Sequence, residues 1–197
     1  MINDPDENTG LPVAADRFFG DDVGSRVAWA SGWELEHDWY HHVTGYKDAA
    51  DVLLAHLENT GRDARKLGPP IAFLYRHHLE LALKLLARQC GRLLGRDAIA
   101  PPSHRLDQLW RLCLSLLLEV SAGTTAADEV KQTTTLIDEF CRADATSEAF
   151  RYPEDKEGYP TLSGEIDLDR LREVISKVSL LLDCISTDIS VRDRDTF

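Results

Sequence analysis

Residues 69–94 read PPIAFLYRHHLELALKLLARQCGRLL and form the longest uninterrupted helical pattern in the chain. Pro69 and Pro70 suit the first turn of a helix, where no backbone N–H is required. The run of leucine, alanine, lysine and arginine that follows has high helix propensity. Gly91 and Gly95 are stop signals. The pattern predicts one long helix over residues 69–94.

Placed at 100° per residue, the polar side chains of this helix share one arc, and the rest of the circumference is almost entirely apolar. The polar arc holds Arg76, His77, Glu80, Lys84 and Arg88. An apolar stripe this wide is typical of a helix packed on several sides, so we expect the central helix of a bundle. His78 lies within the stripe, where we expect a buried histidine with a satisfied hydrogen bond.

Two interpretations of the polar arc are open. In the first, Arg76, Glu80 and Lys84 form a ladder of i, i+4 ion pairs, each worth about 0.2–0.5 kcal/mol. In the second, Arg76, His77 and Glu80 face a groove or a partner chain and carry function.

Helical periodicity predicts further helices on both sides of this one. Their expected places are 31–61, as one helix or two joined near Thr44–Gly45; His104–Val120, with Ser103 as N-cap; Ala126–Arg142, with Thr125 as N-cap; and a last helix to Ser186, with Asp167 as N-cap. Together they predict an all-α, single-domain helical bundle of about five helices.

The regions between and around these helices divide the chain. Residues 1–31 are polar and acidic and predict a loose N-terminal arm, residues 32–186 predict the bundle, and residues 187–197 predict a frayed polar tail. One long irregular loop, about 143–166, interrupts the bundle; a loop of this length is often functional or a short hairpin. Its aromatic side chains are expected to pin it to the helices: Phe150, Tyr152 and Tyr159.

Composition narrows the class of protein. A hydrophobic fraction of 43% excludes global disorder. The sequence contains no run of 18 apolar residues, so it predicts no membrane-spanning helix. The acidic start MINDPDENTG has no signal-peptide pattern, so we expect a cytoplasmic protein. The four cysteines are widely spaced within apolar helical patterns and are interpreted as reduced core thiols, with no zinc site or disulfide framework. They are Cys90, Cys113, Cys141 and Cys184.

The net charge of −12 is unevenly distributed. Residues 62–111 carry 10 basic and 4 acidic side chains, a net charge of +6, whereas residues 1–61 and 112–197 each carry −9. The basic block is either a face that binds RNA or another anion, or the positive side of charge matching within the fold.

Residues 37–42 read HDWYHH, and on a helix His37 and His41 share a face. Histidines at i, i+4 can bind one divalent metal together. No third ligand lies at a recognised spacing, so we predict no metal and no cofactor, and keep a metal site here as the weakest alternative.

Four segments carry a resemblance to known proteins. They are GYKDAAD (45–51), IAFLYRHHLELALK (71–84), HRLDQLW (104–110) and SEAFRYPEDKEGYPTL (147–162). With them, the chain resembles a family of uncharacterised bacterial proteins related to HEPN domains, the helical-bundle superfamily of many RNA-cutting toxins and phage-defence proteins. The resemblance covers roughly residues 33–185.

The resemblance implies a homodimer that acts on RNA. HEPN ribonucleases pair an Arg-x(4–6)-His motif from each subunit at a shared groove, but no arginine here precedes a histidine by that spacing; Arg96 and His104 come nearest. The candidate site is therefore chosen from polar position and from the segments above. Its residues are Arg76, His77, Glu80 and His104 for catalysis, and Lys84, Arg88, Asp107, Arg151 and Tyr152 for binding.

The expected function is an HEPN-like protein of a defence or toxin-related type that binds RNA or a nucleotide at the basic central helix, with or without cleavage. The alternative is a non-catalytic module that binds a partner protein and has no affinity for nucleic acid. Salt-sensitive binding of RNA separates the two.

Overall fold

The computed structural model describes residues 35–61, 63–96, 103–121, 127–144, 147–162 and 164–195. The chain divides into two units, Met1–Trp33 and Glu34–Phe197, and every described residue belongs to the second. The described residues form five helices: α1 (Leu35–Thr60), α2 (Ala64–Leu93), α3 (Leu106–Val120), α4 (Ala127–Ala143) and α5 (Leu168–Asp195). The predicted all-α bundle is confirmed, and the arm expected at residues 1–31 lies outside the described residues.

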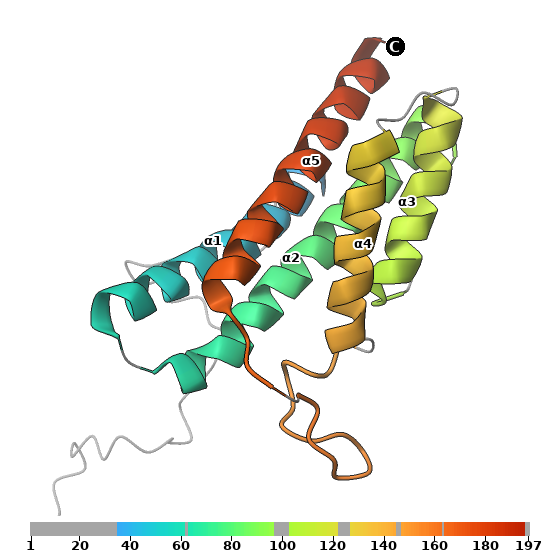
Figure 1. Ribbon diagram of the computed structural model, residues 1–197. Coiled ribbons are helices and arrows are strands. Elements are labelled where there is room, and N and C mark those ends of the chain that lie inside the picture. The colour runs from blue at the N-terminus through green and yellow to red at the C-terminus, as the bar shows by residue number, and fades with distance from the viewer. Residues whose placement is uncertain are drawn as a thin grey trace, which may run out of the picture. The chain divides into compact units, whose positions relative to one another are not determined.

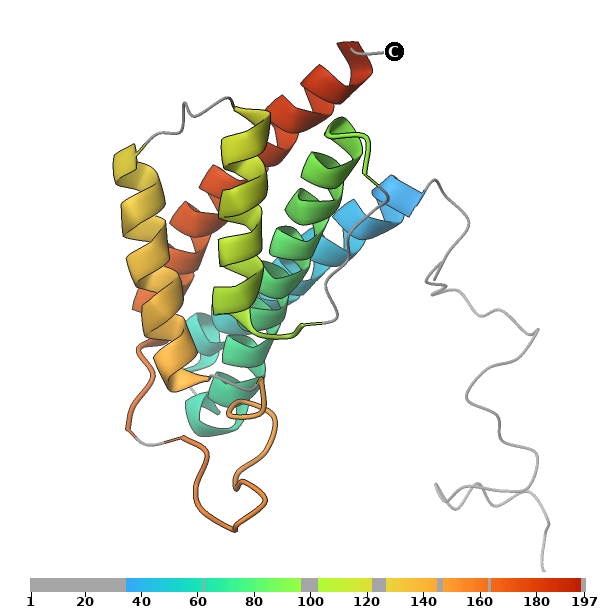
Figure 2. The same ribbon diagram turned by 90° about the vertical axis from the view of Figure 1, so that its right-hand side faces the viewer.

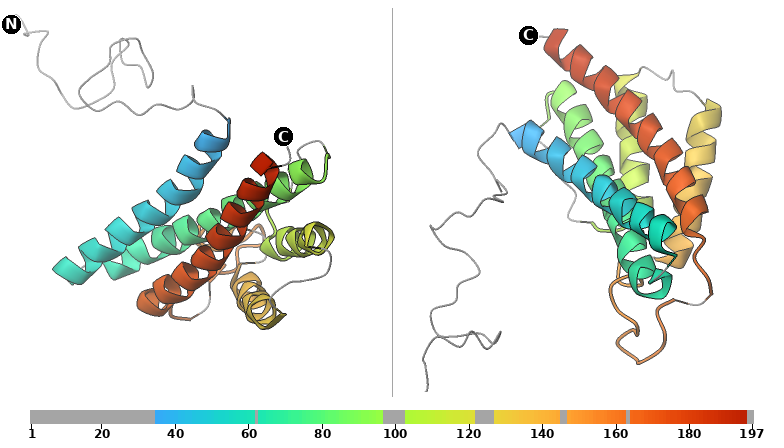
Figure 3. Two further views of the ribbon diagram at one scale, coloured as in Figure 1. Left: turned by 90° about the horizontal axis from the view of Figure 1, so that it is seen from above. Right: turned by 90° about the vertical axis from the view of Figure 1, so that its left-hand side faces the viewer.

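The central position predicted for the long helix is confirmed. α2 packs against α1, α3 and α5, and α4 packs against α3 (Figure 1). α3 and α4 stand side by side in Figure 2. Seen from above, α1 lies on the other side of α2 from that pair, and α5 crosses over α2 (Figure 3, left).

The start of α2 differs from the prediction. The helix begins at Ala64, so Pro69 and Pro70 lie in its second turn. A residue before proline normally avoids the helical region because its Cβ clashes with the proline ring, but Gly68 has no Cβ. The carbonyls four residues before each proline lose their usual N–H donor, and they lie in an exposed turn where water can replace it.

The end of α2 is set by Gly95. Its φ of +66° is left-handed, a conformation that glycine adopts without steric cost. The N–H of Arg96 donates to the Gly91 carbonyl at 2.9 Å and the N–H of Gly95 to the Arg92 carbonyl at 2.8 Å, which is the Schellman pattern. Gly91 itself is buried inside the helix, so its role as a stop signal was predicted wrongly.

For the first region the sequence left open one helix or two, and α1 passes through Gly45 as one helix. α3 begins at Leu106 and not at His104, because the Ser103 hydroxyl accepts from the Arg105 N–H and contacts Gln108 instead of capping the first turn. The N-cap predicted for α4, Thr125, lies outside the described residues.

α5 is longer than predicted. Asp167 is its N-cap, and the Asp167 carboxylate accepts from the Arg170 N–H at 3.0 Å. The helix continues to Asp195, so the frayed tail predicted from residue 187 is wrong for 187–195. Two contacts stabilise this extension: Ile189 is buried in the core at 2% exposure, and Asp193 pairs with Arg92 of α2 at 2.7 Å.

The core forms where α2 meets its neighbours. Burying one large aliphatic or aromatic side chain stabilises the fold by roughly 1.5–3 kcal/mol. Polar groups at the core are paired: the Trp110 N–H donates to the Thr134 hydroxyl at 2.8 Å, and the Tyr75 hydroxyl donates to Asp51 at 2.5 Å. The side chains that are less than 2% exposed include Ile71, Tyr75, Leu83, Leu86, Leu106, Leu109, Trp110, Ile137 and Ile175.

The long loop is anchored at its start and projects at its tip. Phe150 is buried and meets Phe140 of α4 edge-on, with ring centroids 5.8 Å apart, as predicted. The tip turns back through a single antiparallel bridge between Glu154 and Pro160. Tyr152 and Tyr159 are 54% and 68% exposed, so neither pins the loop to the helices.

The cysteine prediction holds for two of the four positions. Cys90 and Cys113 are buried, whereas Cys141 is half-buried and Cys184 is exposed on α5. Cys184 was assigned to the core because it lies among apolar residues in sequence, but it falls on the outward side of α5. All four thiols are free. In the described part of the chain, no helix combines the length and the apolar character that a membrane crossing needs.

Candidate functional site

Arg76 lies at the meeting point of three elements. Its side chain is fully buried, pairs with Glu80 one turn later on α2 at 2.7 Å, and pairs with Asp144 just after α4 at 2.8 Å. It also donates to the backbone carbonyl of His104, ahead of α3. The guanidinium has five donors in a rigid plane, which suits a group that must satisfy several acceptors at once. Arg76 therefore joins α2 to the start of α3 and the end of α4.

Glu80 is the centre of the site. Its carboxylate is 2% exposed and accepts from Arg76, from Lys84 at 2.8 Å and from the His104 ring at 2.8 Å. Burial opposes ionisation of this carboxyl group, but the hydrogen bonds from Lys84, Arg76 and His104 outweigh it and lower the pKa of Glu80 to about 2. Glu80 is therefore ionised at neutral pH.

Two imidazoles flank this carboxylate. The His104 side chain is 67% exposed, and its Nδ1 contacts Glu80. Because an ionised carboxylate only accepts, the His104 Nδ1 carries a hydrogen and donates, and its Nε2 is directed away from Glu80. The Nδ1 of His77 lies 3.9 Å from the other Glu80 oxygen, and the His77 side chain is 26% exposed.

His77 is held by aromatic rings. It stacks on Phe73 with centroids 5.7 Å apart and meets Tyr46 of α1 edge-on at 4.4 Å. Burial is the main reason that the pKa of His77 lies below its usual value, and Arg76 lowers it further. His77 is therefore uncharged at neutral pH and keeps a ring nitrogen able to accept a proton.

The long loop brings a cation to the same end of the bundle. The Arg151 guanidinium lies over the Phe73 ring at 5.9 Å and over the Tyr152 ring at 5.5 Å. Its Nε donates to the Ser147 carbonyl at 2.6 Å. Phe73 also stacks on His77, so the Phe73 ring contacts both Arg151 and the His77 imidazole.

Seven of the nine site residues predicted from the sequence thus gather around Glu80 and Phe73. The other two lie in separate contacts. Asp107 is bound by Arg105 and Arg111, each at 3.1 Å, and Arg88 lies over the Trp39 ring at 5.4 Å.

Sequence reasoning missed three contributors to this site. Asp144 follows the last residue of α4, and its carboxylate is fully buried between Arg76 and the Ala149 N–H. Nothing in the local pattern distinguishes it from the other acidic residues nearby. Phe73 and Tyr46 read as ordinary apolar positions, and only the fold places them against His77.

The first interpretation of the polar arc, a ladder of ion pairs, is correct about which residues pair, but it gave no sign that the pairs are buried. Arg76–Glu80–Lys84 is an ion-pair ladder, but the guanidinium and the central carboxylate are buried. The basic block is likewise largely matched within the fold. Further pairs join Lys66 to Asp63, Arg92 to Asp193 and Arg96 to Glu119.

A metal site receives no support from the described residues, which contain no group of three His, Cys, Asp or Glu side chains arranged to hold an ion. The side chain of His37 lies outside the described residues, and His42 Nδ1 contacts the Asp38 carbonyl at 2.7 Å.

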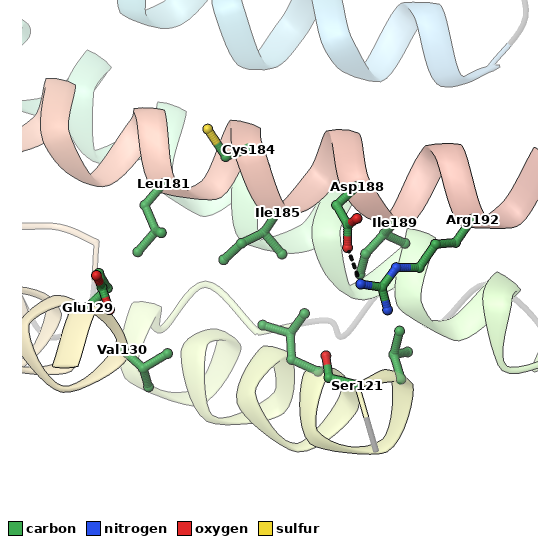
Figure 4. Close-up of a pocket in the computed structure, with 11 residues that line it drawn as sticks. Ser121, Glu129, Val130, Leu181, Cys184, Ile185, Asp188, Ile189 and Arg192 are labelled. Atoms are coloured by element: carbon green, nitrogen blue, oxygen red, sulfur yellow. Dashed lines mark ion pairs between the residues drawn. The ribbon is translucent and has the colours of Figure 1, made fainter. Parts of the chain in front are cut away.

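A cleft of about 240 Å³ separates α5 from the ends of α3 and α4 (Figure 4). Val130, Leu181 and Ile185 give it apolar walls, and Asp188 pairs with Arg192 at one end at 2.7 Å. It shares no residue with the surroundings of Glu80.

The fold and this site define an all-α bundle with a buried ionic centre and two partly accessible histidines. Comparisons of the chain with models of protein families, with curated proteins and with solved structures give no match. The resemblance to HEPN domains therefore stays a prediction.

Proposed function

We propose that this chain is an HEPN-like, RNA-binding protein that cleaves RNA by general acid–base catalysis at Glu80, His77 and His104. The observation that carries the proposal is the contact between the buried Glu80 carboxylate and the exposed His104 ring. A buried anion that orients an accessible imidazole is a common element of acid–base sites.

Each nearby group has a role in the proposed reaction. The 2′-hydroxyl of a nucleotide attacks the adjacent phosphorus and loses its proton to His77, which is uncharged at neutral pH. The bond from phosphorus to the 5′-oxygen breaks, and His104 gives that oxygen a proton. The products are a 2′,3′-cyclic phosphate and a 5′-hydroxyl.

Arg151 supplies positive charge for the phosphate, and Tyr152 offers an exposed ring on which a base can stack. Arg76 is too deeply buried to touch a substrate and acts as a positioning residue, because it fixes Glu80 and the His104 backbone. This arrangement differs from the Arg-x(4–6)-His motif of HEPN ribonucleases, since here the two histidines come from one chain.

The test is incubation of purified protein with labelled single-stranded RNA, with and without a chelator, over a range of salt concentrations. We expect cleavage that survives the chelator, and loss of cleavage in His104→Gln and His77→Gln. His56→Gln is the matched control, because His56 is exposed on α1 away from these contacts. If wild-type protein shows neither cleavage nor salt-dependent RNA binding, the proposal is wrong.

A second candidate is a module that binds a partner protein. The favouring observation is that most cations of the basic block already pair with carboxylates, while the loop tip exposes Tyr152 and Tyr159. Exposed tyrosines are frequent in protein interfaces. This candidate predicts a partner that is retained by wild-type protein and lost with Tyr152→Ala and Tyr159→Ala, in the absence of any RNA affinity.

A further inference from the structure

A second site lies on the opposite side of α2 from the Glu80 cluster. A pocket of about 410 Å³ opens between α1 and α5, the two helices nearest the viewer in Figure 3, right. His77 and His78 point about 100° apart on the helix, so His78 faces this pocket while His77 faces Glu80. The proposed RNA chemistry does not use this side of the molecule.

His78 is fixed at the base of the pocket by two hydrogen bonds. Its Nδ1 lies 2.8 Å from the Val43 carbonyl of α1, and its Nε2 lies 3.0 Å from the Ser179 hydroxyl of α5. A carbonyl oxygen can only accept, so the hydrogen is on Nδ1 and the lone pair is on Nε2. The Ser179 hydroxyl must then donate to Nε2.

The environment keeps this ring uncharged. His78 is 2% exposed, and burial is the main reason that its pKa lies below the usual value; the nearby charge of Lys47 lowers it further. An uncharged imidazole whose lone pair meets a serine hydroxyl, and whose other nitrogen is oriented by a third group, is the arrangement that activates serine nucleophiles. Here the backbone carbonyl of Val43 takes the orienting role.

We propose that this pocket is an acyl-transfer site in which Ser179 is the nucleophile and His78 the general base, acting on small uncharged esters. Ser179 is half-buried and lines the pocket, so a small substrate can reach its hydroxyl.

The reaction balances with groups that are present. Ser179 Oγ attacks the ester carbonyl carbon and passes its proton to His78 Nε2. The new oxygen–carbon bond forms as the bond to the alcohol oxygen breaks, and the alcohol leaves with that proton. Water, deprotonated by His78, then hydrolyses the acyl-serine. Lys47, which lines the pocket and also pairs with Asp51 at 2.7 Å, brings positive charge toward the carbonyl oxygen.

The rim of the pocket limits the substrate. Tyr40 and Leu180 are 51% and 65% exposed there and suit a short apolar acyl group. Asp48 and Asp183 also line the pocket, against the single ammonium of Lys47, and disfavour anionic substrates.

The experiment treats the full chain with a fluorophosphonate probe and maps the adduct by mass spectrometry. In the adduct, an oxygen–phosphorus bond to serine replaces the phosphorus–fluorine bond. We expect the label on Ser179 of the wild-type protein and its loss in Ser179→Ala. Ser176→Ala is the matched control, because Ser176 lines the same pocket one turn earlier and should leave labelling unchanged.

Hydrolysis of p-nitrophenyl acetate is the second readout. Surface imidazoles hydrolyse this ester slowly, so the hydrolysis rate of wild-type protein is compared with that of Ser179→Ala, where we expect at least a tenfold lower rate. His78→Gln should lower the rate similarly, and circular dichroism confirms that this variant is folded. If the probe leaves Ser179 of the wild-type protein unmodified, or if Ser179→Ala hydrolyses the ester at the wild-type rate, the hydrogen bond is structural and the proposal is overturned. Neither outcome depends on RNA cleavage at Glu80.

Discussion

Replacing Arg76 with alanine tests whether the ionic centre stabilises the fold. The side chain is fully buried and neutralises two carboxylates, those of Glu80 and Asp144. After the substitution Glu80 keeps Lys84 and His104, but Asp144 keeps only the Ala149 N–H. Removing one partner of a buried ion pair costs about 3–5 kcal/mol, because the remaining charge stays buried without compensation.

For a domain of this size, 1 kcal/mol shifts the melting temperature by roughly 2–4 °C, so Arg76→Ala should lower it by about 6–20 °C. The assays are thermal unfolding, which gives the melting temperature, and urea unfolding, which gives the free energy of unfolding, both at pH 7 and followed by circular dichroism. The control is Arg111→Ala, whose side chain is 71% exposed in its pair with Asp107 and should cost less than about 1 kcal/mol.

The double variant Arg76→Met, Asp144→Leu sharpens the test. It removes the guanidinium together with its most isolated partner, and buried ion pairs can be replaced by apolar groups at little cost. We expect it to recover part of the free energy of unfolding lost in Arg76→Ala. If Arg76→Ala and Arg111→Ala cost the same, within about 0.5 kcal/mol, the reasoning about the buried centre is refuted.

Three further predictions concern acid stability, thiols and glycines. The pKa of Glu80 is about 2 in the folded protein against 4.5 ordinarily, so ionisation of Glu80 stabilises the fold fully above pH 4.5, and this stabilisation is lost as the pH falls toward 2. Between pH 4.5 and 2, the urea midpoint should therefore fall less steeply in Glu80→Gln than in wild type. Native protein should react with a thiol reagent rapidly at Cys184, whereas Cys90, whose pKa burial raises to about 11, should react only after unfolding. Gly95→Ala should cost about 1 kcal/mol because of the positive φ, and Gly45→Ala, at an open position inside α1, should gain about 0.5–1 kcal/mol in urea unfolding.

Each of these has an outcome that contradicts it. If the urea midpoints of wild type and Glu80→Gln fall equally between pH 4.5 and 2, other carboxylates determine the loss of stability in acid. Rapid native labelling of Cys90 would mean that α2 opens easily. A stabilising Gly95→Ala would exclude the left-handed cap at the end of α2.

The sequence predicted the candidate site better than it predicted the roles of its residues. The spacing of Arg76, Glu80 and Lys84 predicted their ion pairs correctly, because i, i+4 contacts depend only on the geometry of one helix. It could not show that Glu80 is buried. That depends on His104 and Asp144, which reach Arg76 and Glu80 from other elements and carry no periodic signal.

By itself, the sequence determined the number of helices, their order and the central place of α2. These follow from a wide apolar stripe and from local start and stop signals such as Asp167 and Gly95. Only the tertiary structure decided the ends that depend on neighbours. α5 continues to Asp195 because Ile189 is buried and Asp193 pairs with Arg92 of α2. The same holds for both proposed sites: the contacts of Glu80 with His104 and of His78 with Ser179 join residues from separate elements, and no pattern within one segment encodes such contacts.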